Sequence, residues 1–427
     1  MGKNINTIFL LIALTAISLL ITGCGRKQEG IKPETVISEI TQSEEETITL
    51  EEPDITEETE ENQLLERVQK MNLQEKIGQL VIIGINGAKA NEEELKLIAE
   101  RSVGGVIFFQ RNVENETQLS TLIESLNEAN GNSSLPLFLS IDEEGGKVTR
   151  LSNIFPNFRS AYELGKLNNE EASYKYGSLQ ALKLKYFGIN MDFSPVLDVS
   201  SNAKNRVIGD RSISQNPEIV AIQGVSIAKG IMSQGIIPVV KHFPGHGDTS
   251  VDSHEGLPVI NKNRDRLFKQ DIYPFKYSID NGIPAVMVGH LLVTAFDDEP
   301  ASVSNIVIND LLRGDLGFNG VVFSDDMTMG AVTKGYGTAG AAAKFIISGG
   351  DVALICHGTE SVNEFLDSME EMVISGLITE EQINEKVLRI AALKEQFIVN
   401  DLDQQQNDLQ ELIEMMDKFN AEWEEFK

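Results

Sequence analysis

The sequence of 427 residues is poor in cysteine, tryptophan, histidine and basic side chains. It contains only two cysteines, Cys24 and Cys356, so its stability must come from a buried core and not from a disulfide framework. Its 36 Lys and Arg are outnumbered by 65 Asp and Glu, which gives a formal net charge of −29. No basic stripe is present to neutralise phosphates, and this argues against nucleic acid as a partner.

A long hydrophobic run is also missing. The apolar stretch over residues 8–20 is too short to cross the hydrocarbon core of a bilayer, which is about 30 Å thick. With Lys3 before it and small residues after it, residues 1–23 have the layout of a secretory signal peptide. An uncleaved anchor helix is the alternative. The sequence Ile-Thr-Gly-Cys24 resembles a bacterial lipobox, which implies cleavage before Cys24, lipidation of its thiol and a lipid anchor in the membrane.

Two acidic segments flank the middle of the chain. Residues 25–63 hold 13 Asp and Glu against 3 Lys and Arg, with few bulky apolar side chains, so we expect residues 24–63 to form a disordered tether. Residues 400–427 hold 9 acidic and 2 basic residues. Here six apolar side chains recur at helical spacing, which predicts an amphipathic helix that packs on the protein's own barrel. They are Leu409, Leu412, Ile413, Met416, Phe419 and Trp423.

Between these segments, residues 64–399 alternate short apolar runs with longer segments of helical period, as βαβ units of a parallel sheet do. We expect strands near residues 79–85, 104–109, 135–142, 189–195, 236–242, 285–290, 320–325 and 351–356. Helices are predicted over residues 170–187, 218–233, 264–281 and 338–348. Eight strands favour a single catalytic domain of the α/β class, a (β/α)8 TIM-type barrel. An open doubly wound sheet is the alternative, but no Gly-x-Gly-x-x-Gly turn follows the first strand.

Ionisable residues gather where the predicted strands end. The third strand ends in Asp142-Glu-Glu-Gly-Gly, the fifth in Lys241-His242, and the seventh in Ser324-Asp-Asp. All five histidines also fall at or just after a strand end: His242, His246, His254, His290 and His357. Because the strand tips of a barrel surround one mouth, this clustering predicts an active site there.

Four motifs carry a resemblance to a known family. Residues 241–254 read Lys-His-Phe-Pro-Gly-His-Gly-Asp-Thr-Ser-Val-Asp-Ser-His, residues 142–150 contain Asp-Glu-Glu-Gly-Gly, residues 206–212 contain Gly-Asp-Arg-Ser, and residues 323–329 contain Ser-Asp-Asp. Over about residues 64–395 the chain is similar to the NagZ-type β-N-acetylhexosaminidases of glycoside hydrolase family 3.

The resemblance implies a role for each matching residue. Asp325 is the nucleophile, and His254 paired with Asp252 is the acid/base, since an imidazole titrates near neutrality and a carboxylate can orient it. Asp326 is the ambiguity beside Asp325, because alternate side chains point to opposite faces of a strand. A purely structural alternative is that these acids only cap the following helix. The implied substrate contacts are Asp142, Arg150, Arg211, Lys241 and His242.

The implied reaction is retaining hydrolysis of terminal, non-reducing β-N-acetylglucosamine without a metal or organic cofactor. We expect a monomeric enzyme that is lipid-anchored on the extracellular face of a bacterial membrane and acts on peptidoglycan fragments, including muropeptides. A family 3 β-glucosidase or glycoside phosphorylase is the nearest alternative. A metal-dependent barrel hydrolase is less favoured because residues 84–90 offer no His-x-His after the first strand. A non-enzymatic sugar-binding lipoprotein is the alternative from another class.

Overall fold

The computed structural model describes residues 57–249, 256–399 and 408–426. These residues belong to one compact unit, Ile55–Lys427. The expected signal peptide with Cys24, most of the expected tether, and both members of the expected dyad, Asp252 and His254, lie outside the described residues.

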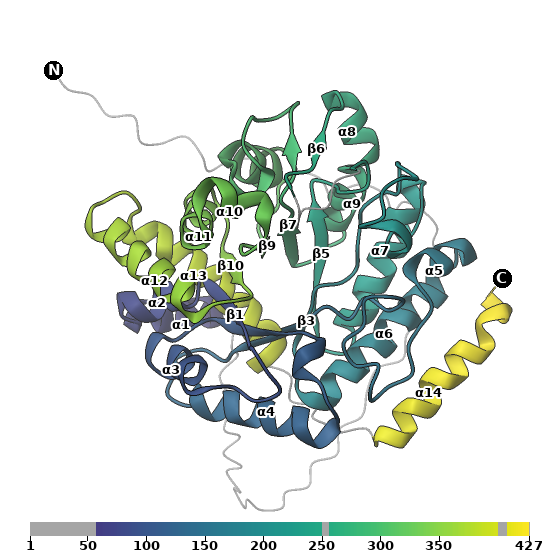
Figure 1. Cartoon of the computed structure of the whole chain (residues 1–427), viewed down its shortest axis with the longest axis horizontal. Helices are drawn as coiled ribbons and strands as arrows, with labels where there is room; N and C mark the ends of the chain where they lie inside the picture. Colours follow the sequence, from purple (N-terminus) through teal and green to yellow (C-terminus); the bar gives the residue numbers. More distant parts are fainter. Residues whose placement is uncertain (1–56, 250–255, 400–407, 427) are drawn as a thin grey trace, which may run out of the picture. The chain divides into compact units, whose positions relative to one another are not determined.

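The main chain forms a closed barrel of eight parallel strands, in the spatial order β1-β10-β9-β7-β5-β4-β3-β2 (Figure 1). The predicted (β/α)8 barrel is confirmed, and each strand falls in a region where the sequence predicted one. The strands are β1 (Val81–Gly84), β2 (Gly105–Phe108), β3 (Phe138–Ile141), β4 (Met191–Asp192), β5 (Ile237–Phe243), β7 (Ala285–Val288), β9 (Val321–Asp326) and β10 (Val352–Ile355). Two short strands that the sequence analysis did not predict, β6 (Val259–Ile260) and β8 (Leu292–Val293), pair with each other outside the barrel.

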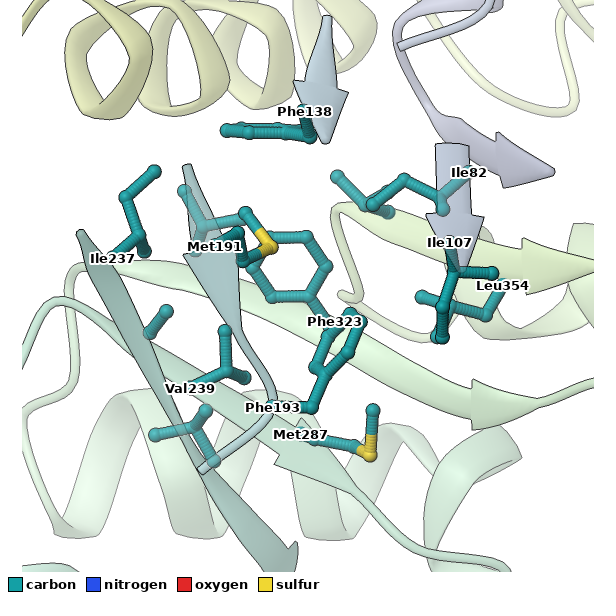
Figure 2. Packing of buried hydrophobic residues seen from close by; sticks show 14 of the residues in the cluster. Ile82, Ile107, Phe138, Met191, Phe193, Ile237, Val239, Met287, Phe323 and Leu354 are labelled. Atoms are coloured by element: carbon teal, nitrogen blue, oxygen red, sulfur yellow. The ribbon is translucent and has the colours of Figure 1, made fainter. Parts of the chain in front are cut away.

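Large apolar side chains fill the inside of the barrel. Phe323 lies at the centre, with ring centroids 5.8 Å from Phe138 and 5.9 Å from Phe193, in edge-to-face contacts (Figure 2). All three rings are fully buried. Because barrel strands are covered on both faces, they appear in the sequence as continuous apolar runs, and this is why they could be located.

The amino end of the barrel is closed by a buried lysine. The Nζ of Lys394 donates hydrogen bonds to Gln79 Oε1 at 2.7 Å and to the Gly104 carbonyl at 2.9 Å, and it lies 4.4 Å from the centroid of the Phe138 ring. Burial lowers the pKa of Lys394 well below its ordinary value. The amine therefore lies beneath the aromatic core, with an amide oxygen and a carbonyl oxygen, both uncharged, as its hydrogen-bond partners.

Helices surround the strands (Figure 1). They are α1 (Glu57–Lys70), α2 (Leu73–Gly78), α3 (Glu92–Arg101), α4 (Glu116–Ala129), α5 (Ala161–Leu167), α6 (Glu170–Phe187), α7 (Pro217–Met232), α8 (Arg264–Gln270), α9 (Tyr273–Asp280), α10 (Gly330–Tyr336), α11 (Thr338–Ile347), α12 (Thr359–Ile374), α13 (Glu380–Lys394) and α14 (Leu409–Ala421). Π-helical segments cover Ile306–Asp315 and Glu395–Val399. Several of the helices begin at an Asn, Ser or Thr whose side chain accepts a hydrogen bond from the first turn.

Two expectations need correction. The predicted helix over residues 264–281 is broken into α8 and α9, where buried Asp271 accepts hydrogen bonds from Lys262 Nζ and Pro274 begins a new helix. The tether was expected to reach residue 63, but α1 already begins at Glu57. Val68 anchors this helix in the core.

The predicted C-terminal helix is present as α14, followed by a 3-10 turn over Glu422–Phe426. It packs on the barrel domain as expected, with Leu412, Met416, Phe419 and Trp423 buried and contacts to α6. In the ranges that the structure describes, no helix is both long and apolar enough to pass through a bilayer.

Candidate active site

A cavity of about 210 Å³ opens among the carboxyl ends of the barrel strands. The polar side chains around it come from four parts of the chain: the loop after β3, the segment after β4, and the ends of β5 and β9. Six residues predicted from the sequence line it: Asp142, Arg150, Arg211, Lys241, His242 and Asp325. The structure therefore brings together every predicted site residue that lies within the described part of the barrel.

Five of the lining residues form one continuous chain of alternating charge. Arg150 Nη2 lies 3.3 Å from Asp142 Oδ2, and Asp142 Oδ1 accepts a hydrogen bond from Lys241 Nζ at 2.6 Å. Lys241 Nζ also lies 2.7 Å from Glu144 Oε1. Glu144 in turn accepts two hydrogen bonds from Arg211, at 2.7 and 2.8 Å. Each charge is held by a neighbour, so the set presents fixed donors and acceptors to the cavity.

The ion pairs shift the pKa values of the groups that form them. Burial by itself would raise the pKa of Glu144, but Arg211 and Lys241 hold this pKa well below its ordinary value. Burial likewise opposes ionisation of Asp142, yet Lys241 and Arg150 lower its pKa. Burial alone would lower the pKa of Lys241, but Asp142 and Glu144 raise it. The network is therefore ionised near neutral pH.

A buried carboxylate fixes the loop that carries these groups. Glu143 accepts hydrogen bonds from Lys183 Nζ on α6 at 2.6 Å, from Thr149 Oγ1 at 2.6 Å and from the backbone N–H of Arg150 at 2.7 Å. Lys183 and Glu143 are almost completely buried. Glu143 thus points away from the cavity while Asp142 and Glu144 point into it, as alternation along an extended chain requires.

Asp198, in the segment after β4, holds the ring of His242 and the backbone of His246. His242 Nδ1 lies 2.6 Å from Asp198 Oδ2, and the backbone N–H of His246 donates to Asp198 Oδ1 at 2.6 Å. His246 also lines the cavity, and its Nδ1 lies 2.9 Å from Thr249 Oγ1. Its Nε2 is buried and has no hydrogen-bond partner among the residues that the structure describes. Burial lowers the pKa of His246, so its ring is neutral near pH 7.

The two acids at the end of β9 have different environments. Both oxygens of Asp326 are engaged, with the Thr328 N–H at 2.9 Å, the Cys356 N–H at 3.2 Å and the Thr328 hydroxyl at 2.6 Å. Asp325 accepts one hydrogen bond, from the Asp326 N–H at 2.8 Å, and among the described residues its second oxygen accepts none. Burial would raise the pKa of Asp325, but His290 and His242 lower it. Asp325 is thus an ionised carboxylate with a free oxygen at the cavity.

The remaining histidines have supporting positions. His290, at the end of β7, is fully buried, with Nδ1 2.7 Å from Ser302 Oγ and Nε2 2.9 Å from the Asp326 carbonyl. Since a carbonyl can only accept, Nε2 carries a proton and holds the end of β9 in place. His357 stacks on Phe109 at a centroid distance of 6.0 Å.

Of the acidic, basic and histidine side chains that line the cavity, Glu144 and His246 were not predicted as site residues, and Asp326 was named only as the ambiguity beside Asp325. Both Glu144 and His246 lie inside motifs that were singled out, and Glu144 stands two positions after Asp142, which places the two side chains on the same side of an extended segment. Among residues 57–249, 256–399 and 408–426, no three His, Cys, Asp or Glu side chains are grouped as a metal site would require.

Known proteins resemble this chain closely. Residues 72–393 match the family described as the glycosyl hydrolase family 3 N terminal domain. A protein named beta-hexosaminidase from Nitrosomonas eutropha is 33% identical over 297 residues, which is 68% of this chain and 84% of that protein. A family 3 beta-N-acetylglucosaminidase structure from Paenibacillus sp. str. FPU-7 superposes with a TM-score of 0.77 at 38% identity, covering 82% of this chain and 68% of that one. The structure of NagZ from Neisseria gonorrhoeae with N-trifluoroacetyl-D-glucosamine has a TM-score of 0.61 at 30% identity, over 74% of this chain and 98% of that chain.

Proposed function

This chain belongs to glycosyl hydrolase family 3, and from that membership and the geometry of its cavity we propose that it is a retaining β-N-acetylhexosaminidase with Asp325 as its nucleophile. The observation that carries the proposal is the free, ionised oxygen of Asp325 beside a chain of fixed charges in the barrel mouth. A glycosidase nucleophile must be ionised and unencumbered at neutral pH, and Asp325 meets both requirements.

In the proposed reaction, one oxygen of Asp325 attacks the anomeric carbon of a terminal β-N-acetylglucosamine. The bond from that carbon to the leaving oxygen breaks, and His254 transfers its proton to the leaving oxygen. His254 then takes a proton from water, whose oxygen attacks the same carbon and releases Asp325. The two inversions leave the product with the configuration of the substrate.

The contacts to the sugar are assigned to the alternating-charge chain. Asp142, Lys241 and Arg211 would bind hydroxyl groups of the terminal sugar, and Arg150 and His242 would complete the pocket. Charge-assisted hydrogen bonds are directional and strong, which suits a ligand that carries hydroxyls on every side. Because these side chains already hold one another, little ordering entropy is lost when the sugar binds.

The test compares Asp325→Ala, Asp325→Asn and His254→Ala on 4-nitrophenyl β-N-acetylglucosaminide. We expect both Asp325 variants to lose nearly all turnover while still binding N-acetylglucosamine. Azide added to Asp325→Ala should yield a glycosyl azide of the α-configuration, because attack from the vacated face inverts the centre. His254→Ala should lose more activity on poor leaving groups than on nitrophenol. Equal losses on both kinds of leaving group would refute its role as proton donor.

Alternative activities are separated by the same assays. A β-glucosidase would release nitrophenol faster from the glucoside than from the N-acetylglucosaminide, and a phosphorylase would need inorganic phosphate and form a sugar phosphate. Unchanged rates after a chelator is added would argue against a metal-dependent hydrolase. Sugar binding without turnover on any glycoside would favour a binding lipoprotein.

The natural substrate and the location are further parts of the proposal. Lipidation of Cys24 would hold the enzyme on the extracellular face of the membrane, where peptidoglycan fragments are the available N-acetylglucosaminides. We expect the wild type to fractionate with membranes and Cys24→Ala to be released. Higher kcat/KM on muropeptides than on chitin oligosaccharides would support peptidoglycan turnover, and the reverse order would favour chitin.

A further inference from the structure

The C-terminal helix α14 packs against the segment that supports the charged loop of the cavity. Phe419 on α14 is fully buried, and its ring centroid lies 5.6 Å from that of Phe158 and 6.3 Å from that of Tyr176 on α6. Asn420 Nδ2 donates to the Asn157 carbonyl at 3.3 Å. The helix therefore contacts Asn157, Phe158 and Tyr176 at the same time.

Residues 157–159 and Tyr176 are bonded directly to the loop over residues 142–151, here called the β3 loop. Tyr176 OH lies 2.8 Å from the Glu144 carbonyl and 3.0 Å from the Arg159 carbonyl. The N–H of Gly146 donates to the Phe158 carbonyl at 3.1 Å, and Asn157 Nδ2 donates to the Gly146 carbonyl at 2.6 Å. The backbone of the β3 loop is thus tied to the surface on which α14 rests.

The β3 loop packs closely against these supports. At Gly145, where φ is +80°, an added Cβ would lie 2.0 Å from the Tyr176 hydroxyl oxygen. The adjacent Glu144 carboxylate holds both Arg211 and Lys241. A displacement of the Tyr176 ring would therefore move the Glu144 carboxylate. This carboxylate positions Arg211 and Lys241, two of the residues that are expected to contact the sugar.

We propose that α14 is a brace that sets the geometry of the β3 loop, with Phe419 as a positioning residue for substrate binding. Residues 408–426 lie beyond the segment that matches the family, residues 72–393, and the barrel closes without them. This assignment rests on the proposed function, because the β3 loop is expected to bind the terminal sugar. Misplacing Glu144 weakens sugar binding and leaves Asp325 on β9 in place.

The experiment measures KM and kcat for 4-nitrophenyl β-N-acetylglucosaminide with the full chain carrying Phe419→Ala. We expect KM to rise roughly 3- to 10-fold while kcat stays within about twofold. Phe419→Leu keeps most of the volume of the side chain, so it should raise KM only about twofold. This variant provides the test if Phe419→Ala does not fold. Met415→Ala, on the exposed side of the same helix, should behave as the wild type.

A second control separates positioning from loss of stability. Met369→Ala makes a buried cavity in α12, a helix that packs on α11 and on the β1 side of the barrel, whereas the β3 loop follows β3. All assays are run well below the unfolding temperature of every variant. An unchanged KM in the Phe419 variants, or an equal rise in Met369→Ala, would overturn the brace. If the wild type proves to be inactive on these glycosides, calorimetric Kd values for N-acetylglucosamine give the same comparison among the variants. Failure of the proposed brace is thereby distinguished from failure of the proposed hexosaminidase activity.

Discussion

Glu144 in the β3 loop and Lys241 on β5 form an ion pair of 2.7 Å at the wall of the cavity, with both side chains buried. Lys241 bridges Glu144 to Asp142, and Glu144 bridges Lys241 to Arg211. Removal of either central charge leaves two neighbouring charges with one ion-pair partner fewer in a buried site, which costs more than the pair itself contributes.

The first prediction concerns Glu144→Gln. The amide of glutamine has the shape of the carboxylate but cannot neutralise Arg211 and Lys241, so both side chains should change their positions. We expect kcat/KM on the nitrophenyl glycoside to fall roughly tenfold or more, equivalent to about 1.4 kcal/mol or more of transition-state binding. Glu128→Gln, on the exposed surface of α4, is the control. Wild-type kinetics in Glu144→Gln would show that the network does not order the site.

The second prediction is a pH dependence of stability. The folded-state pKa values of Glu144 and Asp142 are lowered by their cationic partners, so the stabilisation is complete above the ordinary values of 4.5 and 3.8 and is lost as pH falls below them. Asp192, whose pKa burial raises, acts in the opposite sense. Urea unfolding of wild type and Glu144→Gln from pH 6 to pH 3 isolates the contribution. The variant should lose less stability on acidification, and parallel curves would contradict this linkage.

The third prediction concerns His246, whose Nε2 has no partner in the described structure. If substrate or a bound water supplies that partner, His246→Phe should reduce kcat/KM by about 2- to 10-fold, the cost of one hydrogen bond. Because burial keeps the ring neutral, the acid limb of the pH–rate profile should not move. His246→Gln should recover part of the loss. A shifted acid limb would instead assign His246 a role in proton transfer.

The fourth prediction concerns the buried pair of Lys183 and Glu143. Lys183→Met leaves the Glu143 carboxylate buried without its cation and should lower the free energy of unfolding by about 3–5 kcal/mol, measured by urea titration at pH 7. Lys166→Met, which breaks an exposed pair on α5, should change stability little. A small effect at Lys183 would mean that hydrogen bonds from the Thr149 hydroxyl and from the backbone N–H groups of Arg150 and Leu151 suffice to hold Glu143.

The barrel could be predicted because its physical basis is local. A strand covered on both faces is an unbroken apolar run, and its polar end marks the mouth, so Asp142, Lys241 and Asp325 were placed on one surface from the sequence. Which charged residues of the cavity pair with which could not be predicted in this way. That Glu144 bridges Arg211 and Lys241 depends on distances between strands far apart in the chain, and no local pattern encodes them.

The errors also have identifiable causes. Helical period continues through residues 264–281, but the buried Lys262–Asp271 pair stops α8, and Pro274 was the local signal for a new start. The early start of α1 was hidden because an acidic stretch has the same composition in a tether and in an exposed helix. The catalytic roles of Asp325, Asp252 and His254, the sugar contacts and the lipidation of Cys24 remain predictions.

The amine of Lys394 and the buried aromatic rings above it fill the amino-terminal part of the barrel, and the cavity lies at the opposite end, among the strand tips. Substrate, products and water that pass through the mouth at the strand tips would obstruct one another. In the proposed reaction the released aglycone must vacate the entrance before hydrolytic water can arrive by the same route. The lifetime of the glycosyl-enzyme should then depend on how quickly the first product departs, so bulky leaving fragments are expected to slow the second half-reaction as well as the first.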